Sequence, residues 1–313
     1  MTLAQGKIFK FGEPEEVIDH LKSLDTKIYV FDPRKLKVAL ENNRLFLQSE
    51  EGLKLRFAIR KAFLYKLLKW FKIPPNSTRH LSNDTIVLIC NENLSSIESA
   101  EVNVTVENGE ALTITSNKYT RITDLEVIEN AKKFGMEIDA ISRDDFILRI
   151  NTKNITESQP VVNDICGYGF NIVNSETGFS PVRMEHFIYR YWCSNGATAK
   201  INFENRTLFH YGISKHNLFQ IVNNQLANAE KSRNKLIDKL EKSVNEDAKK
   251  YFDDISMKLN SVVPREKSYH FFKDFEKNSS KYDLFNYITD NAKRYDLLTR
   301  YQLERIAGNL ILN

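Results

Sequence analysis

The stretch AEVNVTVENGEALTITS, residues 100–116, predicts two β-strands joined by a tight turn. Aliphatic residues alternate with polar ones before and after Asn108-Gly109, a pair that favours a two-residue hairpin turn because both residues accept positive φ. Similar short runs of β-branched and aromatic residues continue to about residue 210. They predict strands at TIVLIC (85–90), FILRI (146–150), GYGFNIV (167–173) and MEHFIYRYWC (184–193). The middle of the chain therefore indicates a mostly antiparallel sheet.

Helical patterns lie on both sides of these strands. From Phe57 onward the chain carries apolar residues at helical spacing, and Pro74 and Pro75 end that helix. Beyond residue 214, apolar residues recur at three- and four-residue steps, which predicts a long amphipathic helix or a helical hairpin. A second helical block follows at 281–312. We therefore expect an α+β fold, with a central, mostly antiparallel sheet, flanking helices and a long amphipathic helical C-terminal third.

The change of pattern along the chain predicts three regions. Residues 1–50 are expected to be an N-terminal extension, residues 51–213 an α+β core, and residues 214–313 a helical C-terminal region. No internal repeat with a period of about 20 to 50 residues is evident, which argues against a solenoid.

Composition limits the kind of protein this chain can be. The 313 residues include 45 lysines and arginines against 41 aspartates and glutamates, so a nucleic-acid site has to be a local patch. Three widely separated cysteines, Cys90, Cys166 and Cys193, argue against a disulfide framework and for a reducing compartment. No apolar run reaches the roughly 18 residues of a membrane span, and the N-terminus lacks the apolar stretch of a secretory signal. We expect a cytoplasmic protein without membrane contact.

The segment LKLRFAIRKAFLYKLLKWFKIPP (53–75) is the most basic part of the chain, and no acidic residue falls between Glu51 and Asp84. Trp70 and its aromatic neighbours offer stacking faces for unpaired bases, while basic side chains release counterions when they meet phosphates. The candidate phosphate contacts are Lys61, Lys66, Lys69, Lys72 and Arg79. An amphipathic helix with a solvated lysine face explains the same pattern, so this alternative stays open.

The strand predicted at 184–193 is a second candidate surface. Alternation places Arg190 and Trp192 on one face, together with His186. Arg183, Arg190 and Trp192 are therefore candidate contacts for single-stranded nucleic acid by stacking and cation–π interaction. The alternative is a buried strand whose polar ends find partners within the fold.

Cys193 precedes a predicted turn at Asn195-Gly196 and is a candidate thiol nucleophile. Catalysis would require a lowered thiolate pKa and a base such as His186 or His210, and the spacing shows neither. A tight turn with Cys193 as a small buried residue is the simpler interpretation. The segment 174–178 is likewise expected to be a turn between strands.

The sequence offers no metal or cofactor motif. Histidines near residue 210 have no cysteine or paired carboxylate at ligand spacing, which argues against zinc. The neighbouring Asp144 and Asp145 would point to opposite faces of a strand. There is no GxxxxGK[ST] loop, and Gly167-x-Gly169 lacks the third glycine of a dinucleotide-binding turn. We therefore predict no metal, no cofactor and no catalytic residue.

Four segments carry a family resemblance: LYKLLKWFKIPP (64–75), TSNKYTRITDLEVIE (115–129), NSETGFSPVRMEHFIYRYWCSNG (174–196) and KYDLFNYITDNAKR (281–294). In this order they resemble a family of phage- and plasmid-encoded proteins known as domain of unknown function 932. The third segment is the most specific, because it is similar to the family's Asn-Ser-Glu-x-Gly and Arg-x-x-Cys-x-Asn-Gly motifs. Its matching residues are Asn174, Ser175, Glu176, Gly178, Cys193, Asn195 and Gly196. Thr123 departs from the family pattern, and residues 1–50 match none of it.

The resemblance implies a mobile-element protein in the cytoplasm of a host cell, with no activity attached to it; a kinship with Rad52-like strand-annealing proteins has no motif here to carry it. The basic segment and the aromatic-basic strand at 184–193 lead us to expect a homo-oligomer, assembled through its long C-terminal helix, that binds and anneals single-stranded DNA without sequence specificity. One alternative is a phage structural or host-interaction protein acting through protein contacts. A second alternative is a cysteine-dependent enzyme.

Overall fold

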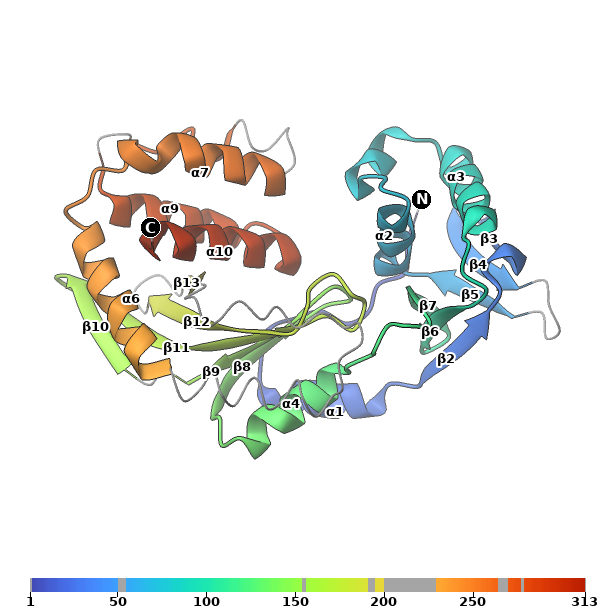
Figure 1. The fold of residues 1–313 in the computed structure, drawn as a ribbon, viewed down its shortest axis with the longest axis horizontal. Helices are drawn as coiled ribbons and strands as arrows, with labels where there is room; N and C mark the ends of the chain where they lie inside the picture. The colour runs from blue at the N-terminus through green and yellow to red at the C-terminus, as the bar shows by residue number, and fades with distance from the viewer. Residues whose placement is uncertain are drawn as a thin grey trace.

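The computed structural model describes residues 2–49, 55–153, 156–190, 195–199, 229–263, 270–276 and 279–312. Over these residues the chain forms two mostly antiparallel sheets with helices packed on both, so the expected α+β class is confirmed. Figure 1 shows the two sheets side by side, with the C-terminal helices on one and helices from the N-terminal half on the other.

The six-stranded sheet contains the predicted hairpin. Its strand order is β2 (Thr26–Phe31), β6 (Val102–Glu107), β7 (Glu110–Ser116), β5 (Arg56–Ile59), β4 (Arg44–Ser49) and β3 (Leu36–Glu41). β6 and β7 confirm the hairpin, with Asn108 and Gly109 at φ 50° and 78°. Two helices, α2 (Lys61–Trp70) and α3 (Asn83–Ser96), pack on this sheet and bury aliphatic residues against Val102 and Val104.

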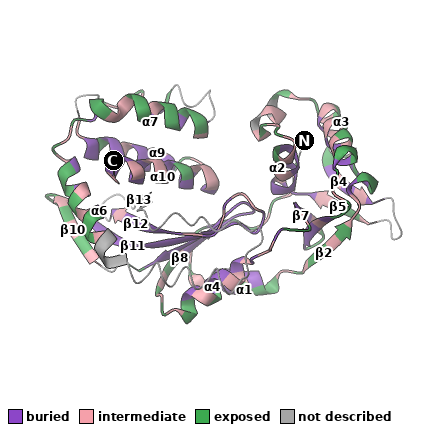
Figure 2. Ribbon diagram, in the orientation of Figure 1, coloured by how far each residue is buried: buried purple, intermediate pink, exposed green. Residues whose placement is uncertain are grey.

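The seven-stranded sheet has helices on two sides. Its order is β1 (Phe9–Gly12), β8 (Ile138–Arg143), β9 (Leu148–Thr152), β11 (Asp164–Asn174), β12 (Arg183–Arg190) and β13 (Asn195–Ala199), with β10 (Thr156–Val161) paired to β11. Below it in Figure 1 lie α1 (Pro14–Ser23) and α4 (Asp124–Lys133). The C-terminal helices are α6 (Ala229–Ser243), α7 (Lys249–Val262), α9 (Lys281–Ala292) and α10 (Leu297–Leu312). They share a core with Tyr168 and Ile188, and Figure 2 shows the buried residues along the central strands.

The first fifty residues, expected to be an extension, supply strands to both sheets. β1 pairs with β8 in the seven-stranded sheet, and β2, β3 and β4 make up half of the six-stranded sheet. A short 3₁₀ turn, η1 (Pro33–Lys35), connects β2 to β3. This region therefore helps to build both cores.

The strand predicted at 85–90 is wrong, because these residues belong to α3. The Ser82 side chain caps this helix by accepting a hydrogen bond from the Thr85 backbone N–H at 3.1 Å. Ile86, Cys90 and Leu94 then recur at four-residue steps and are buried. Tertiary burial of that helical face outweighs the β-branched composition of TIVLIC.

The helix predicted from Phe57 begins four residues later than expected. Residues 56–59 form β5, where Phe57 and Ile59 face the core, and α2 follows from Lys61. Arg60 lies at the N-cap with an extended backbone (φ −78°, ψ 158°). The strand β5 and the helix α2 are separated only by Arg60, so their apolar residues form one continuous pattern in the sequence. This is why the sequence predicts too early a start for the helix.

The C-terminal helical pattern forms separate helices in the described residues. The predicted long helix is divided into α6 and α7, and Leu236, Leu240 and Leu259 are buried within one chain. The residues of that pattern before 229 lie outside the described part. None of the described helices combines the length and apolar content needed to cross a bilayer.

Candidate functional site

A pocket of about 190 Å³ lies where α2 packs against β7. Its lining combines two lysines, an indole, a backbone glycine and hydroxyl groups: Lys66, Lys69, Trp70, Ile114, Thr115, Ser116 and Gly178. The lysines and Trp70 come from the basic segment, and Gly178 comes from the 174–178 motif. The fold thus unites two segments that the sequence marked separately. We call this set of residues the α2 pocket.

Lys66 is the most constrained cation of the α2 pocket. Its Nζ donates a hydrogen bond to the Gly178 carbonyl oxygen at 3.0 Å. The rings of Tyr119 and Phe179 lie 5.9 and 5.8 Å from the same nitrogen, and Phe179 also lies 5.7 Å from Lys69 Nζ. Burial lowers the pKa of Lys66 to about 8, and the positive charge of Lys69 acts in the same direction. An anion bound next to Lys66 would raise its pKa again, because it stabilises the protonated amine.

Gly178 has a conformational reason to be glycine. Its φ is +77°, in the left-handed region that residues with a Cβ adopt only with strain. An added Cβ would also collide with Lys66 Nζ and crowd the Tyr119 ring. The backbone therefore approaches the lysine closely only because no side chain stands between them.

The other predicted phosphate contacts lie outside the α2 pocket. Lys61 Nζ lies 5.2 Å from the Tyr65 ring and 5.9 Å from the Phe146 ring. Lys72 is exposed just beyond α2, at φ 59°. Arg79 belongs to η2 (Pro75–His80), but its side chain lies outside the description. Lys61 and Lys72 remain available as outer contacts.

The second predicted surface does not join the first. Arg190 is 8% exposed and forms an ion pair with Asp164, with Nε and Oδ1 3.1 Å apart. Its guanidinium also lies 5.7 Å from the Tyr282 ring. In Figure 1 the arrow of β12 points away from α2. Because Arg190 is buried and its guanidinium already lies beside the Tyr282 ring, a base has no open face to stack on, and we leave Arg190 out of the candidate site.

The remaining residues of this surface are less defined. Arg183 is half-buried at the first position of β12, and Trp192 and Cys193 lie outside the described residues. Asn195 and Gly196 open β13, where they pair with Arg190 and Tyr189. The tight turn predicted at Asn195-Gly196 is therefore wrong, because the strand begins there.

The described residues provide no test of Cys193 as a nucleophile. Cys193 and His210 lie outside the described residues, and His186 is buried in β12. Burial lowers the pKa of His186 to about 4 and raises the pKa of Cys166 to about 11. Within the described part of the chain, no cluster of three or more metal-ligating side chains occurs.

The 174–178 motif is buried at the junction between the two sheets. Asn174 Nδ2 donates to Asp124 Oδ1 at 2.9 Å, and Ser175 Oγ donates to the Phe146 carbonyl oxygen at 2.6 Å. Glu176 accepts from the backbone N–H of Asp124 and from Arg121, both at 2.5 Å. These bonds hold the segment that presents Gly178 to Lys66.

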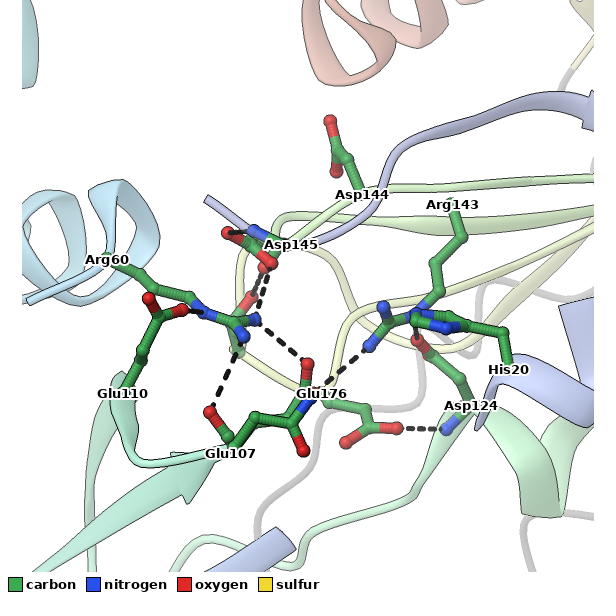
Figure 3. A network of polar contacts seen from close by, with 12 residues as sticks. His20, Arg60, Glu107, Glu110, Asp124, Arg143, Asp144, Asp145 and Glu176 are labelled. Atoms are coloured by element: carbon green, nitrogen blue, oxygen red, sulfur yellow. Dashed lines mark hydrogen bonds and ion pairs between the residues drawn. The ribbon is translucent and has the colours of Figure 1, made fainter. Parts of the chain in front are cut away.

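A buried ion network that the sequence did not predict crosses the same junction (Figure 3). Arg60 donates to Glu107 at 2.9 Å, Glu110 at 2.8 Å and Asp145 at 3.0 Å. Glu107 also contacts Arg143 at 3.4 Å, and Figure 3 shows these side chains converging from both sheets. Within the segment 53–75, Arg60 lies among residues that are otherwise apolar on that side of the expected helix, and this is a local signal for a buried arginine. The two sheets are therefore joined by ion pairs.

Glu176 gives this junction a pH dependence. Burial raises the pKa of its carboxyl to about 7, and the nearby Asp124 carboxylate acts in the same direction. The folded protein thus retains a proton that the unfolded chain has lost above the ordinary glutamate pKa, so this contribution to stability falls as pH rises toward about 7.

We therefore expect Glu176→Gln to flatten the pH dependence of the free energy of unfolding between about pH 5 and pH 8. His186 contributes in the opposite sense, since its lowered pKa makes stability rise with pH, but it is common to both proteins. Urea denaturation of the wild type and the variant at several pH values measures the difference. Parallel pH profiles would contradict the assignment.

Comparison of the chain with models of protein families, with curated proteins and with solved structures finds no match. The resemblance to the domain of unknown function 932 family therefore stays a prediction based on the four quoted segments. Function has to be argued from the α2 pocket itself.

Proposed function

We propose that this protein binds single-stranded nucleic acid, preferentially DNA, at the α2 pocket without reading its sequence. The observation that carries the proposal is the lining of the pocket, in which Lys66 and Lys69 stand beside Trp70 and no acidic residue takes part. Ammonium groups hold phosphates, and an indole stacks on any of the bases. Stacking of this kind needs unpaired bases, which favours a single strand over a duplex.

Lys66 has the properties of an inner phosphate contact. Its ammonium is partly desolvated, and the residues that line the pocket include no carboxylate to form an ion pair with it. A bound phosphate would therefore supply the missing counterion. Because only the protonated amine attracts phosphate, affinity is expected to fall as pH rises through about 8. Exposed Lys69 and Lys72 would extend the contact along the backbone of the strand.

Reversing the charge of the pocket is expected to abolish tight binding. Lys66→Glu combined with Lys69→Glu should weaken affinity for single-stranded DNA by at least about 100-fold at low salt, and the salt slope should fall by about 0.7 for each lost phosphate contact. Fluorescence anisotropy with labelled single-stranded DNA, RNA and duplex DNA, titrated across salt, measures both quantities.

Lys249→Glu combined with Lys250→Glu is the matched control, because it makes the same change in net charge on the exposed surface of α7. It should retain tight binding. Equal losses in the two double variants would show that binding reflects overall charge and would refute the pocket. No binding by the wild type at low salt would refute nucleic-acid binding, and the structural or host-interaction alternative would then be preferred.

A functional measurement completes the test. If binding prefers single strands, the wild type should accelerate annealing of complementary strands and the Lys66→Glu, Lys69→Glu variant should not. This outcome would support a role in annealing single strands.

A further inference from the structure

One edge of the six-stranded sheet is open and the other is covered. At β3, the outer edge is occupied by Asn91 of α3, whose side chain accepts from the Val38 N–H at 2.7 Å and donates to the Val38 carbonyl at 2.9 Å. At the opposite edge, β2 pairs with β6 and with no other strand among the described residues. Figure 1 shows β2 on the outer rim of this sheet, and Figure 2 shows its exposed residues. Open edges of this kind pair with further strands unless something prevents it.

The register shows which backbone groups of β2 point outward. The Asn108 N–H donates to the Asp25 carbonyl at 2.8 Å, so Asp25 opposite Asn108 is a hydrogen-bonded position. In an antiparallel pair these positions alternate with positions whose N–H and C=O groups face away from the partner strand. Thr26, Ile28 and Val30 therefore present their donors and acceptors to the open edge.

The side chains of the same residues are apolar and accessible. Ile28 is 50% and Val30 57% exposed, although both lie in the middle of a regular strand. The strand TKIYVF contains no proline, and its one charged residue, Lys27, is turned toward Asp25 at 2.8 Å. The edge thus lacks most of the devices that keep strands apart.

We propose that two copies of this chain pair through β2, antiparallel and about a two-fold axis, so that their six-stranded sheets become one continuous sheet. The occupant is a second copy because the strand complements itself. With Ile28 opposite the second copy's Val30, all four aliphatic side chains meet on one face. A register shifted by two residues one way pairs Val30 with Thr26, and one shifted by two residues the other way pairs Ile28 with Asp32, so each breaks the match of Ile28 with Val30.

This dimer does not depend on nucleic-acid binding, but it places two α2 pockets on one particle. In the described part of the C-terminal region, α6 and α7 bury Leu236, Leu240 and Leu259 against residues of the same chain.

The test compares two pairs of lysine substitutions by sedimentation and by light scattering across concentration. Ile28→Lys with Val30→Lys should weaken self-association by at least about 100-fold, because it places four charges in an apolar contact. Leu88→Lys with Met257→Lys is the control, since these residues are apolar and 58% and 67% exposed on other elements. The wild type and the control should have twice the 36.4 kDa chain mass, and the β2 variant should have the mass of one chain.

A cross-link tests the register. The two-fold axis places residue 29 opposite itself at a non-hydrogen-bonded position, where Cα atoms lie about 4.5 Å apart and a disulfide fits. Tyr29→Cys in a Cys193→Ser background should therefore form covalent dimers on mild oxidation, whereas Lys37→Cys on β3 should not. A monomeric wild type at all concentrations, or a dimer that survives Ile28→Lys with Val30→Lys, would overturn the proposal.

Discussion

Replacing Arg60 with methionine is expected to lower the free energy of unfolding by about 3–5 kcal/mol. Arg60 is buried and is the shared partner of Glu107, Glu110 and Asp145. Methionine retains much of the apolar packing but removes every donor, so buried Asp145 loses its ion partner and Glu107 retains only the longer contact to Arg143. An unpaired buried carboxylate costs far more than a lost surface ion pair.

Urea denaturation measures this cost, and Arg56→Met is the control. Arg56 pairs with Glu41 on the surface, where removal of an ion pair costs at most about 1 kcal/mol. A double-mutant cycle with Asp145→Asn then isolates the Arg60–Asp145 interaction, since both changes together leave no lone charge at that contact. Equal destabilisation by Arg60→Met and Arg56→Met would refute the importance of the network.

Gly178→Ala is expected to impair both stability and binding. The alanine has to adopt a left-handed backbone, which costs about 1–2 kcal/mol, and its Cβ pushes Lys66 away from the Gly178 carbonyl. Loss of that charged hydrogen bond adds roughly 1.5–3 kcal/mol. Because Lys66 is then displaced in the α2 pocket, affinity for single-stranded DNA should fall by at least about tenfold.

The hairpin provides a control with the same backbone and no neighbours. Gly109 has φ +78°, and an added Cβ there meets nothing within 4 Å. Gly109→Ala should therefore show the backbone strain alone, with wild-type affinity for single-stranded DNA. Denaturation and anisotropy measured on both variants separate strain from displacement of Lys66. Equal effects of the two substitutions on affinity would contradict the contact between Gly178 and Lys66.

The substitutions of Arg60 and Gly178 both test how the two sheets are held together around the α2 pocket. Lys66 belongs to a helix on the six-stranded sheet, and Gly178 follows β11 of the seven-stranded sheet. The α2 pocket exists only while the sheets keep their relative position, which the Arg60 network and the 174–178 motif both maintain. Arg60→Met should consequently weaken binding as well as folding.

Features with local causes could be predicted from the sequence. The Asn108-Gly109 hairpin follows from two residues that accept positive φ. Helix α4 begins directly after Thr123, whose side chain forms a capping box with that of Glu126. The α+β class and the C-terminal helices follow from periodicity along short stretches of chain. Each depends on interactions between residues a few positions apart.

Only the tertiary structure decided which side chains meet. Lys66 and Gly178 are 112 positions apart in sequence, and Arg60 and Asp145 are 85 apart, so no local pattern connects them. Burial in the assembled fold favours a helix for TIVLIC and pairs Arg190 with Asp164. The order of the strands places β2 at the edge of its sheet. Long-range contacts, burial and the position of a strand in its sheet depend on how distant elements pack. Turns, helix caps and periodicity depend on residues close to each other in the sequence.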